Sequence, residues 1–193
     1  MNKAQQMDTQ DLSMRPLNGV DLDTLMGTVS AIQTDPELGI SKFRASNTWI
    51  DGNHNRSRVA GFYAAKQEIG HAQTFTMDAD EPAILAGGDQ AANPVEHLLH
   101  ALASCLTTSI VAHAAVRGIE IEELESELEG DIDLNGFLGL DAKTPKGFTE
   151  IRVRFRVKAD PKDMDSIKQL ATFSPVFNTI TQSARVDVDV VLK

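Results

Sequence analysis

A single cysteine, Cys105, is the side chain of this sequence best suited to nucleophilic or redox chemistry. Without a second cysteine, the chain cannot form an internal disulfide, a CxxC redox pair or a cysteine-rich zinc site. A thiol reacts as its thiolate, so a reactive Cys105 needs a cation or a hydrogen-bond donor near the sulfur. A cysteine in an apolar helix can equally be a small, inert core residue, and both interpretations stay open from the residues alone.

Histidines offer a second kind of chemistry, the binding of a metal ion. His97 and His100 lie about one helical turn apart and could present two nitrogen ligands. A third ligand would have to be Glu96, His113 or His71, and none of these stands at a recognised spacing; the HExxH pattern is also absent. We therefore expect no metal and no cofactor, and interpret the histidines as partly buried, hydrogen-bonded side chains.

The element that must position Cys105 is a central helix with strong signals at both ends. Asn93 is a favourable N-cap, Pro94 suits the first helical position, and Glu96 can complete a capping box. Gly118 favours the end of the helix. Cys105 lies about three turns past the N-cap, so the helix dipole cannot activate its thiol.

The same helix contains a stretch of membrane-spanning length. Residues 97–116 are twenty positions without Asp, Glu, Lys or Arg. The stretch also carries three His, two Ser and two Thr, and much of its apolar content is alanine. We therefore predict a helix buried on most sides by one soluble domain, and no membrane partner.

Alternating patterns predict antiparallel strands around this helix. Residues 42–50 and 56–65 flank a turn-rich segment and predict a hairpin, with a third strand over 72–79. Residues 123–134 alternate acidic with apolar side chains, and residues 149–158 alternate basic with apolar ones. If the last two pair in antiparallel fashion, opposite charges face one another across the strands.

The chain is predicted to close on another alternating strand, over residues 184–193. Its apolar side chains should face the core: Val186, Val188, Val190 and Leu192. Helices are predicted over residues 18–38, 161–173 and 175–182. The fold class is therefore α+β, a mostly antiparallel sheet with helices on one side.

Composition bounds the class of protein. The chain has 193 residues, 41% of them apolar and 24% charged, which predicts one packed domain over residues 18–193 behind a mobile leader, residues 1–17. The net charge of −10 argues against nucleic acid as a partner. The first residues lack the apolar core of a signal peptide, so we expect a cytoplasmic protein.

Two segments together resemble the osmotically inducible protein C and organic hydroperoxide resistance family (OsmC/Ohr). They are NPVEHLLHALASCLTTS (93–109) and SPVFNTITQSARVDV (174–188), and the resemblance covers roughly residues 42–193. It implies an OsmC-like fold and an intertwined homodimer with sites at the dimer interface. In peroxidase members, a cysteine attacks an organic hydroperoxide and becomes a sulfenic acid.

The resemblance also implies roles for individual residues. Cys105 matches the attacking cysteine, and Arg56 or Arg58 matches the hairpin arginine that stabilises the thiolate. The family has a carboxylate at the start of the central helix that orients this arginine. Here Val95 holds its usual place and Glu96 follows, so Glu96 is either that carboxylate or only a helix cap.

The position of the family's second, resolving cysteine is occupied by Ser174, which cannot form a disulfide. The resemblance therefore implies a one-cysteine peroxidase in oxidative-stress defence, with an external thiol as reductant. The alternative is a non-enzymatic, dimeric OsmC-like module that binds a small apolar ligand at the dimer interface, with Cys105 as a packed core residue.

Overall fold

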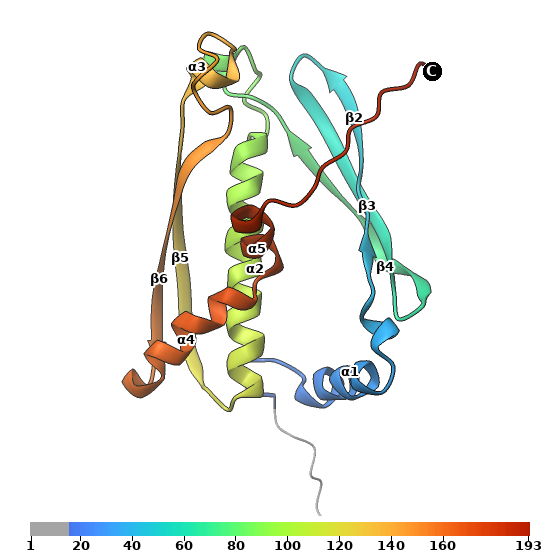
Figure 1. Cartoon of the computed structure of the whole chain (residues 1–193), viewed down its shortest axis with the longest axis vertical. Coiled ribbons are helices and arrows are strands. Elements are labelled where there is room, and N and C mark those ends of the chain that lie inside the picture. The colour runs from blue at the N-terminus through green and yellow to red at the C-terminus, as the bar shows by residue number, and fades with distance from the viewer. Residues whose placement is uncertain (1–15) are drawn as a thin grey trace, which may run out of the picture.

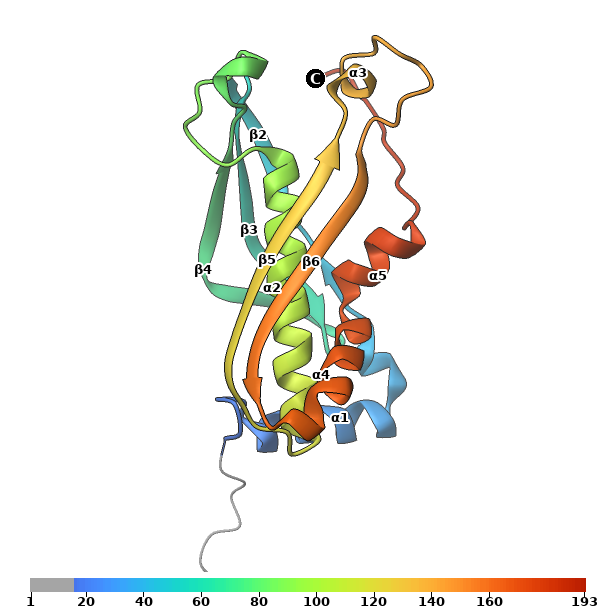
Figure 2. The same ribbon diagram turned by 90° about the vertical axis from the view of Figure 1, so that its left-hand side faces the viewer.

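Two antiparallel sheets flank a long central helix, α2 (Pro94–Val116), in the computed structural model, which describes residues 16–193 (Figure 1). The predicted α+β class, with antiparallel strands and one long helix, is confirmed. The strands divide into two separate sheets, however, rather than forming one sheet with helices on one side (Figure 2). Of the leader predicted over residues 1–17, all but the last two positions lie outside the described residues.

The N-terminal part forms helix α1 (Leu22–Thr34) and a 3₁₀ turn, η1 (Pro36–Gly39). The single helix predicted over residues 18–38 covers both, except that η1 ends one residue later, at Gly39. Asp21 caps α1, because its carboxylate accepts hydrogen bonds from the backbone N–H and the hydroxyl of Thr24. The helix therefore begins four residues later than its apolar pattern suggested.

Four strands make up the first sheet: β1 (Lys42–Phe43), β2 (Ser46–Asp51), β3 (His54–Ala64) and β4 (Gln67–Ala79). The central strand is β3, with β1 and β2 along one edge and β4 along the other, all antiparallel. The predicted hairpin is confirmed as β2–β3. The strand predicted over residues 72–79 is the second half of the longer β4.

The loop from β4 to α2 contains a 3₁₀ turn, η2 (Ala83–Leu85), and is organised by the buried carboxylate of Asp80. That carboxylate accepts hydrogen bonds from the backbone N–H groups of Glu81 (2.8 Å), Gly88 (3.1 Å) and Gln90 (3.2 Å). These bonds, the one from Glu81 foremost, lower the pKa of Asp80. The charged carboxylate thus fixes the path by which the chain enters α2.

The second sheet is a pair of long strands, β5 (Ile121–Ile132) and β6 (Phe148–Ala159), joined by a loop with a short helix, α3 (Leu134–Phe137). The predicted antiparallel pairing of acidic with basic side chains is confirmed, as where Glu125 faces Arg156. The apolar side chains of both strands turn to the other face, toward α2.

Ion pairs follow the outer face of this sheet. Arg152 pairs with Asp131 (2.5 Å) and with Glu129, and Arg156 pairs with Glu127 (2.6 Å). Hydrogen bonds from Arg156 lower the pKa of Glu127, and those from Arg152 lower the pKa of Asp131. Both carboxyl groups therefore bind protons less readily in the folded protein than in the unfolded chain.

This charge ladder predicts a loss of stability in acid. A carboxyl whose pKa is lowered on folding stabilises the fold above its unfolded pKa, near 4.5 for Glu127 and 3.8 for Asp131, and that stability disappears as the pH falls through the folded value. We expect the fall in melting temperature between about pH 6 and pH 3 to be smaller for the double variant Arg152→Gln/Arg156→Gln, measured by circular dichroism. Arg154→Gln is the comparison variant with a smaller expected effect, because Arg154 has no carboxylate within 4.0 Å among residues 16–193 and lowers the pKa of Glu127 only as the last of its causes, through its charge. An equal fall in all three proteins would contradict the prediction.

The C-terminal helices are η3 (Pro161–Asp163), α4 (Met164–Leu170), η4 (Ala171–Phe173) and α5 (Pro175–Gln182), as the two predicted helical segments anticipated. The last three pack on α2 and lie in front of it in Figure 1, whereas the second sheet lies to its left and the first sheet to its right. The buried core lies between α2, β5 and α4. Its buried members are Ile110, Ala114, Ile119, Ile167 and Leu170.

Only one face of α2 is buried, so the prediction that it is buried on most sides is wrong for the single chain. The other face is open, as at Ser104 and Thr108, because the first sheet does not pack along the helix. In residues 16–193, α2 is the one helix long and apolar enough to cross a membrane, with 28% of that stretch buried. The core helix of a soluble protein has the same length and composition.

The strand predicted over residues 184–193 does not form in the single chain, and that prediction is wrong there. The segment has no hydrogen-bonded partner strand in the described residues, and its alternating valines are exposed by 80% or more: Val186, Val188 and Val190. A period-two pattern reports the ability to form a strand, but a strand needs an edge to pair with. This segment extends away from α5 toward the first sheet (Figure 1).

Candidate functional site

Cys105 lies on α2 at the border between the buried and the open face. Its neighbours Leu102 and Leu106 are 3% exposed, whereas Ser104 and Thr108 are exposed and Cys105 itself is partly exposed. The helical period produces this pattern, since consecutive side chains point about 100° apart. Cys105 is therefore a free, partly exposed cysteine in the single chain.

Arg56, on β3, is held by a carboxylate of the adjacent strand. Its Nε donates to Oδ1 of Asp78 (2.6 Å) and its Nη2 to Oδ2 (2.7 Å), a bidentate pair. His54 places Nε2 3.2 Å from the same Oδ2. The hydrogen bonds from Arg56 hold the pKa of Asp78 far below its ordinary value, and they raise the pKa of Arg56. Three of the five guanidinium N–H groups lie outside this pair and can bind another group.

Arg58 shares the face of β3 that carries Arg56, because residues two apart in a strand point the same way. No carboxylate lies within 4.0 Å of Arg58 among residues 16–193. It borders a hollow of about 590 Å³ beside Arg44 and Glu68, which pair with each other (2.7 Å). Of the two candidate arginines, Arg56 is the one that the described residues orient.

Glu96 completes the predicted capping box of α2. Its Oε2 accepts a hydrogen bond from the backbone N–H of Asn93 (2.8 Å), and its own N–H donates to Oδ1 of Asn93 (2.9 Å). The carboxylate of Glu96 therefore turns back to the N-cap. It forms no ion pair with Arg56 or Arg58 within residues 16–193.

Ser174 is fully buried and caps α5. Its Oγ accepts a hydrogen bond from the backbone N–H of Phe177 (3.2 Å), and its exposed fraction is 0%. Serine is among the best N-cap residues, and replacing such a cap by alanine typically costs about 1 kcal/mol. The hydroxyl at this position thus has a structural task at the join between η4 and α5, both of which pack on α2.

The single chain keeps the predicted site residues in separate layers. Within residues 16–193, no hydrogen bond or ion pair joins Cys105 to Arg56, Arg58 or Glu96. α2 packs on β5, α4 and α5, whereas the first sheet stands on its other side (Figure 1). Any direct action of a β3 arginine on the sulfur therefore requires a second chain or a movement of the sheet.

Sequence reasoning missed the group around Asp78. Besides pairing with Arg56 and His54, this residue accepts, at its backbone carbonyl, a hydrogen bond from Nε2 of His97 (2.9 Å). That bond joins the end of β4 to the first turn of α2. The signal that could have found the group is the cross-strand position of Asp78 opposite Arg56, which depends on the register of β3 and β4.

The histidines do not gather around one point. His71 packs its ring against Phe75 (5.2 Å between centroids), and His113 stacks on Phe173 (4.2 Å), where burial lowers the pKa of His113. His97 is engaged with the carbonyl of Asp78. In the part of the chain that the structure describes, no three His, Cys, Asp or Glu side chains are placed to hold a metal ion.

We compared the chain with protein-family models, curated proteins and solved structures. A family model described as OsmC-like protein matches residues 87–189, which include Cys105 and Ser174. No curated protein matches the chain.

Among solved structures, an OsmC-like protein of Mycoplasma pneumoniae aligns with a TM-score of 0.55 and 17% identity, over 74% of this chain and 89% of that one. A proposed osmotic stress induced and detoxification response protein of Psychrobacter arcticus 273-4 aligns with a TM-score of 0.53 and 18% identity, over 70% and 85%. An OsmC-like protein of unknown function from Vibrio cholerae O1 aligns with a TM-score of 0.51 and 15% identity, over 72% of this chain and 94% of that one. At these identities the likeness shows a shared fold.

Proposed function

The chain belongs to the OsmC-like family, and from that premise we propose that it is a one-cysteine thiol peroxidase that reduces organic hydroperoxides in oxidative-stress defence. The observation that carries this function is Cys105, a free, partly exposed thiol in the middle of α2 and inside the residues that match the family. The chain holds no second thiol. A cytoplasmic location suits a lone thiol, which stays reduced there.

The chemistry takes two steps. The Cys105 thiolate attacks the terminal oxygen of ROOH, the O–O bond breaks, and the products are Cys105–SOH and RO⁻, which takes a proton and leaves as ROH. Two external thiols then reduce the sulfenic acid: the first forms a mixed disulfide and releases water, and the second releases Cys105 and a disulfide. Because Ser174 cannot act as the resolving thiol, both reducing equivalents come from outside the chain.

We further propose that residues 18–193 act as one domain in an intertwined homodimer. The open face of α2, the exposed side chain of Trp49 (70%) and the exposed valines of residues 184–193 support a second copy as their cover. In such a dimer, the first sheet of one copy covers α2 of the other. Arg56, already oriented by Asp78, would then stabilise the thiolate of the other copy's Cys105.

A second function is favoured by Ser174, at the position of the family's resolving cysteine, and by Glu96, one residue after the position of its carboxylate, because both side chains serve here in helix caps. If these two side chains only cap helices, the protein would be a non-enzymatic dimeric module that binds a small apolar ligand, and Cys105 would be a packing residue. The thiol of such a module would react slowly with peroxides and alkylating reagents.

One measurement separates the two functions. Purified protein is mixed with cumene hydroperoxide and dithiothreitol, and peroxide consumption is followed beside the pH dependence of Cys105 alkylation. The peroxidase requires consumption that Cys105→Ser abolishes and alkylation that is fast below about pH 8. Absence of thiol-dependent consumption, together with slow alkylation of Cys105 at neutral pH, would leave the binding module as the function.

A further inference from the structure

The open hollow of about 590 Å³ that Arg58 borders on the first sheet has a floor of small residues. The register shift after Val59 sets two glycines opposite each other, Gly61 on β3 and Gly70 on β4, and both line the hollow. Neither glycine has a side chain, so the backbone itself forms this part of the floor. The hollow therefore exists because a cross-strand pair lacks side chains.

The two glycines differ in what the packing of the sheet requires. A Cβ added at Gly61 would lie 2.7 Å from the carbonyl oxygen of Ile69, so a larger residue does not fit there. A Cβ added at Gly70 would meet nothing within 4 Å, and it would point to the face of β4 that carries Glu68, two residues earlier. The space beside Gly70 is thus open on the side where the charged residues lie.

The hollow carries one uncompensated positive charge. Arg44 donates to both carboxylate oxygens of Glu68 (2.7 and 2.9 Å), and these hydrogen bonds lower the pKa of Glu68 and raise that of Arg44. That pair is therefore ionised and neutral as a whole. Arg58 has no carboxylate within 4.0 Å among residues 16–193. In a chain with a net charge of −10, a hollow with a free guanidinium favours an anion.

The donors of the hollow suit a carboxylate. The guanidinium of Arg58 presents N–H groups in a planar fork that matches the two oxygens of a carboxylate. Ser46, the cross-strand partner of Arg58, also lines the hollow and adds a hydroxyl. The nearby carboxylate of Glu68 disfavours a ligand with several negative charges. A molecule with one carboxylate is therefore the best match.

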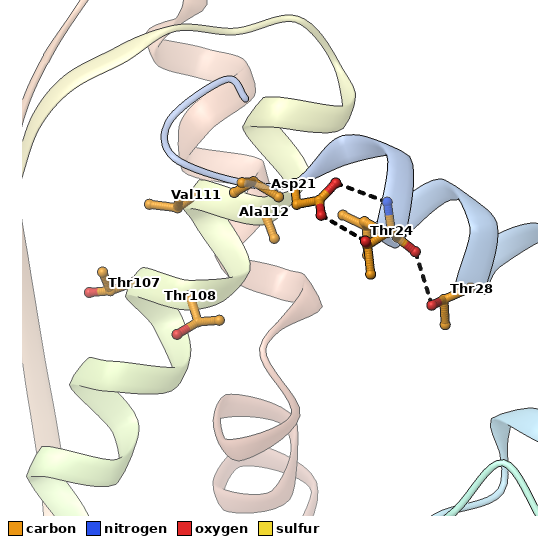
Figure 3. A pocket seen from close by; sticks show the side chains of 9 residues that line it. Asp21, Thr24, Thr28, Thr107, Thr108, Val111 and Ala112 are labelled. Atoms are coloured by element: carbon orange, nitrogen blue, oxygen red, sulfur yellow. Dashed lines mark hydrogen bonds between the residues drawn. The ribbon is translucent and has the colours of Figure 1, made fainter. Parts of the chain in front are cut away.

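The cavity of about 530 Å³ between α1 and α2 has the opposite character (Figure 3). The described residues that line it include no Lys or Arg, and the carboxylate of Asp21 lies on its wall. The hydroxyl of Thr24 donates to Asp21, and that of Thr28 donates to the carbonyl of Thr24. Of these two cavities, the hollow of the first sheet is the one suited to an anion.

The hollow lies beside the arginine that is expected to meet the thiolate. Arg58 follows Arg56 by two residues on the same face of β3, about 7 Å along the strand. In the proposed dimer, Arg56 reaches Cys105 of the other copy. A carboxylate bound to Arg58 would therefore hold the rest of its molecule next to the sulfur that the peroxide oxidises.

We propose that this hollow binds the external reductant of Cys105–SOH, and that the reductant is a small thiol with one carboxylate. The assignment rests on the proposed peroxidase function and names the chemical class of its thiol. With its carboxylate on Arg58, the thiolate attacks the sulfenic sulfur: an S–S bond forms, the S–O bond breaks, and hydroxide takes a proton and leaves as water. A second thiol then breaks that S–S bond, releasing Cys105 as a thiolate and the reductant as its disulfide.

The test measures the reduction step alone. One equivalent of cumene hydroperoxide converts the full-length protein to Cys105–SOH, and loss of the sulfenic acid is followed by stopped flow, with dimedone trapping and mass spectrometry. The reductants are 3-mercaptopropionate and its neutral amide, 3-mercaptopropionamide, compared at equal thiolate concentration. We expect the carboxylate to react at least about tenfold faster at low ionic strength, and by a smaller factor in high salt. Equal rates would overturn the assignment.

Matched variants test whether Arg58 is the binding residue. Arg58→Ala should remove the preference for the carboxylate, and Arg58→Lys should retain part of it, because the charge stays but the planar fork is lost. Arg154→Ala is the control: Arg154 also has no carboxylate within 4.0 Å in the described part of the chain, but it lies on β6 of the second sheet. A preference that persists in Arg58→Ala, or that disappears equally in Arg154→Ala, would contradict the site.

A second pair of variants tests the hollow itself. Gly70→Val fills it and should slow reduction by 3-mercaptopropionate about tenfold. Gly147→Val, at another glycine where an added Cβ meets nothing within 4 Å, should have no such effect, and equal effects would contradict the site. Failure of the peroxidase gives a different result. If no sulfenic acid forms, the peroxidase and its reductant site are both overturned, whereas a sulfenic acid that both thiols reduce equally overturns the reductant site alone.

Discussion

Replacing Arg56 with alanine is expected to slow the reaction of Cys105 with an alkyl hydroperoxide by about a hundredfold, and Arg58→Ala by less than about threefold. The two effects differ because the side chain of Arg56 is held in one orientation and that of Arg58 is not. Arg56 is fixed by two hydrogen bonds to Asp78 and presents its remaining N–H groups in a defined direction, whereas Arg58 has no carboxylate partner in the described residues. The rate constant is measured by stopped flow, with the sulfenic acid trapped by dimedone and identified by mass.

Two further variants test whether orientation is the cause. Asp78→Asn keeps Arg56 but removes the charge of the carboxylate that holds it. We expect a reaction rate between those of the unsubstituted protein and Arg56→Ala, with the largest change in the dependence of that rate on pH. Cys105→Ser must lose the reaction altogether. A larger loss in Arg58→Ala than in Arg56→Ala would reverse the assignment of the two arginines. An unchanged rate in Cys105→Ser would exclude a thiol mechanism.

Elements with local signals could be predicted from the sequence. The capping box of Asn93 and Glu96 fixes the start of α2 within its first turn, so no distant contact was needed to place it. The acidic and basic strands, β5 and β6, specify each other, because their antiparallel pairing sets opposite charges face to face while the apolar side chains share the other face, and a slip by one residue would break both.

The candidate site depended on contacts that local patterns do not determine. Asp78 faces Arg56 only because β3 and β4 pair in a register that shifts midway: the single residue Ala60 of β3 stands opposite four residues, 71–74, of β4. A bulge of this kind has no reliable signature in one sequence. Likewise, the resemblance placed Ser174 at a redox position, but its task as the buried cap of α5 required the packed helices.

The failure of the last predicted strand has a different cause. Its alternating pattern is strong, and its valines are exposed because the segment pairs with no strand edge among residues 16–193. The segment carries Val186, Val188 and Val190 on one face and Asp187 with Val191 on the other. Exposed valines in such a row are costly in water, so the pattern itself points to an edge supplied by another copy.

Val188→Asp is therefore expected to dissociate the proposed homodimer. In a symmetric dimer the substitution occurs twice, and each valine contributes about 1.5 kcal/mol when buried, so the dissociation constant should rise at least about a hundredfold. Val191→Asp is the matched control: it introduces the same charge three residues away, on the opposite face of the segment, and should leave the dimer intact. Sedimentation velocity over a range of protein concentrations measures both.

The same pair of variants connects assembly to chemistry. If Arg56 of one copy acts on Cys105 of the other, Val188→Asp must lose peroxidase activity in proportion to the monomer formed, and activity must recover as protein concentration rises. Val191→Asp should match the unsubstituted protein at every concentration. Full activity in a monomeric Val188→Asp protein would show that Arg56 acts on Cys105 of the same chain. The first sheet would then have to move against α2, from which it is separate in the single chain.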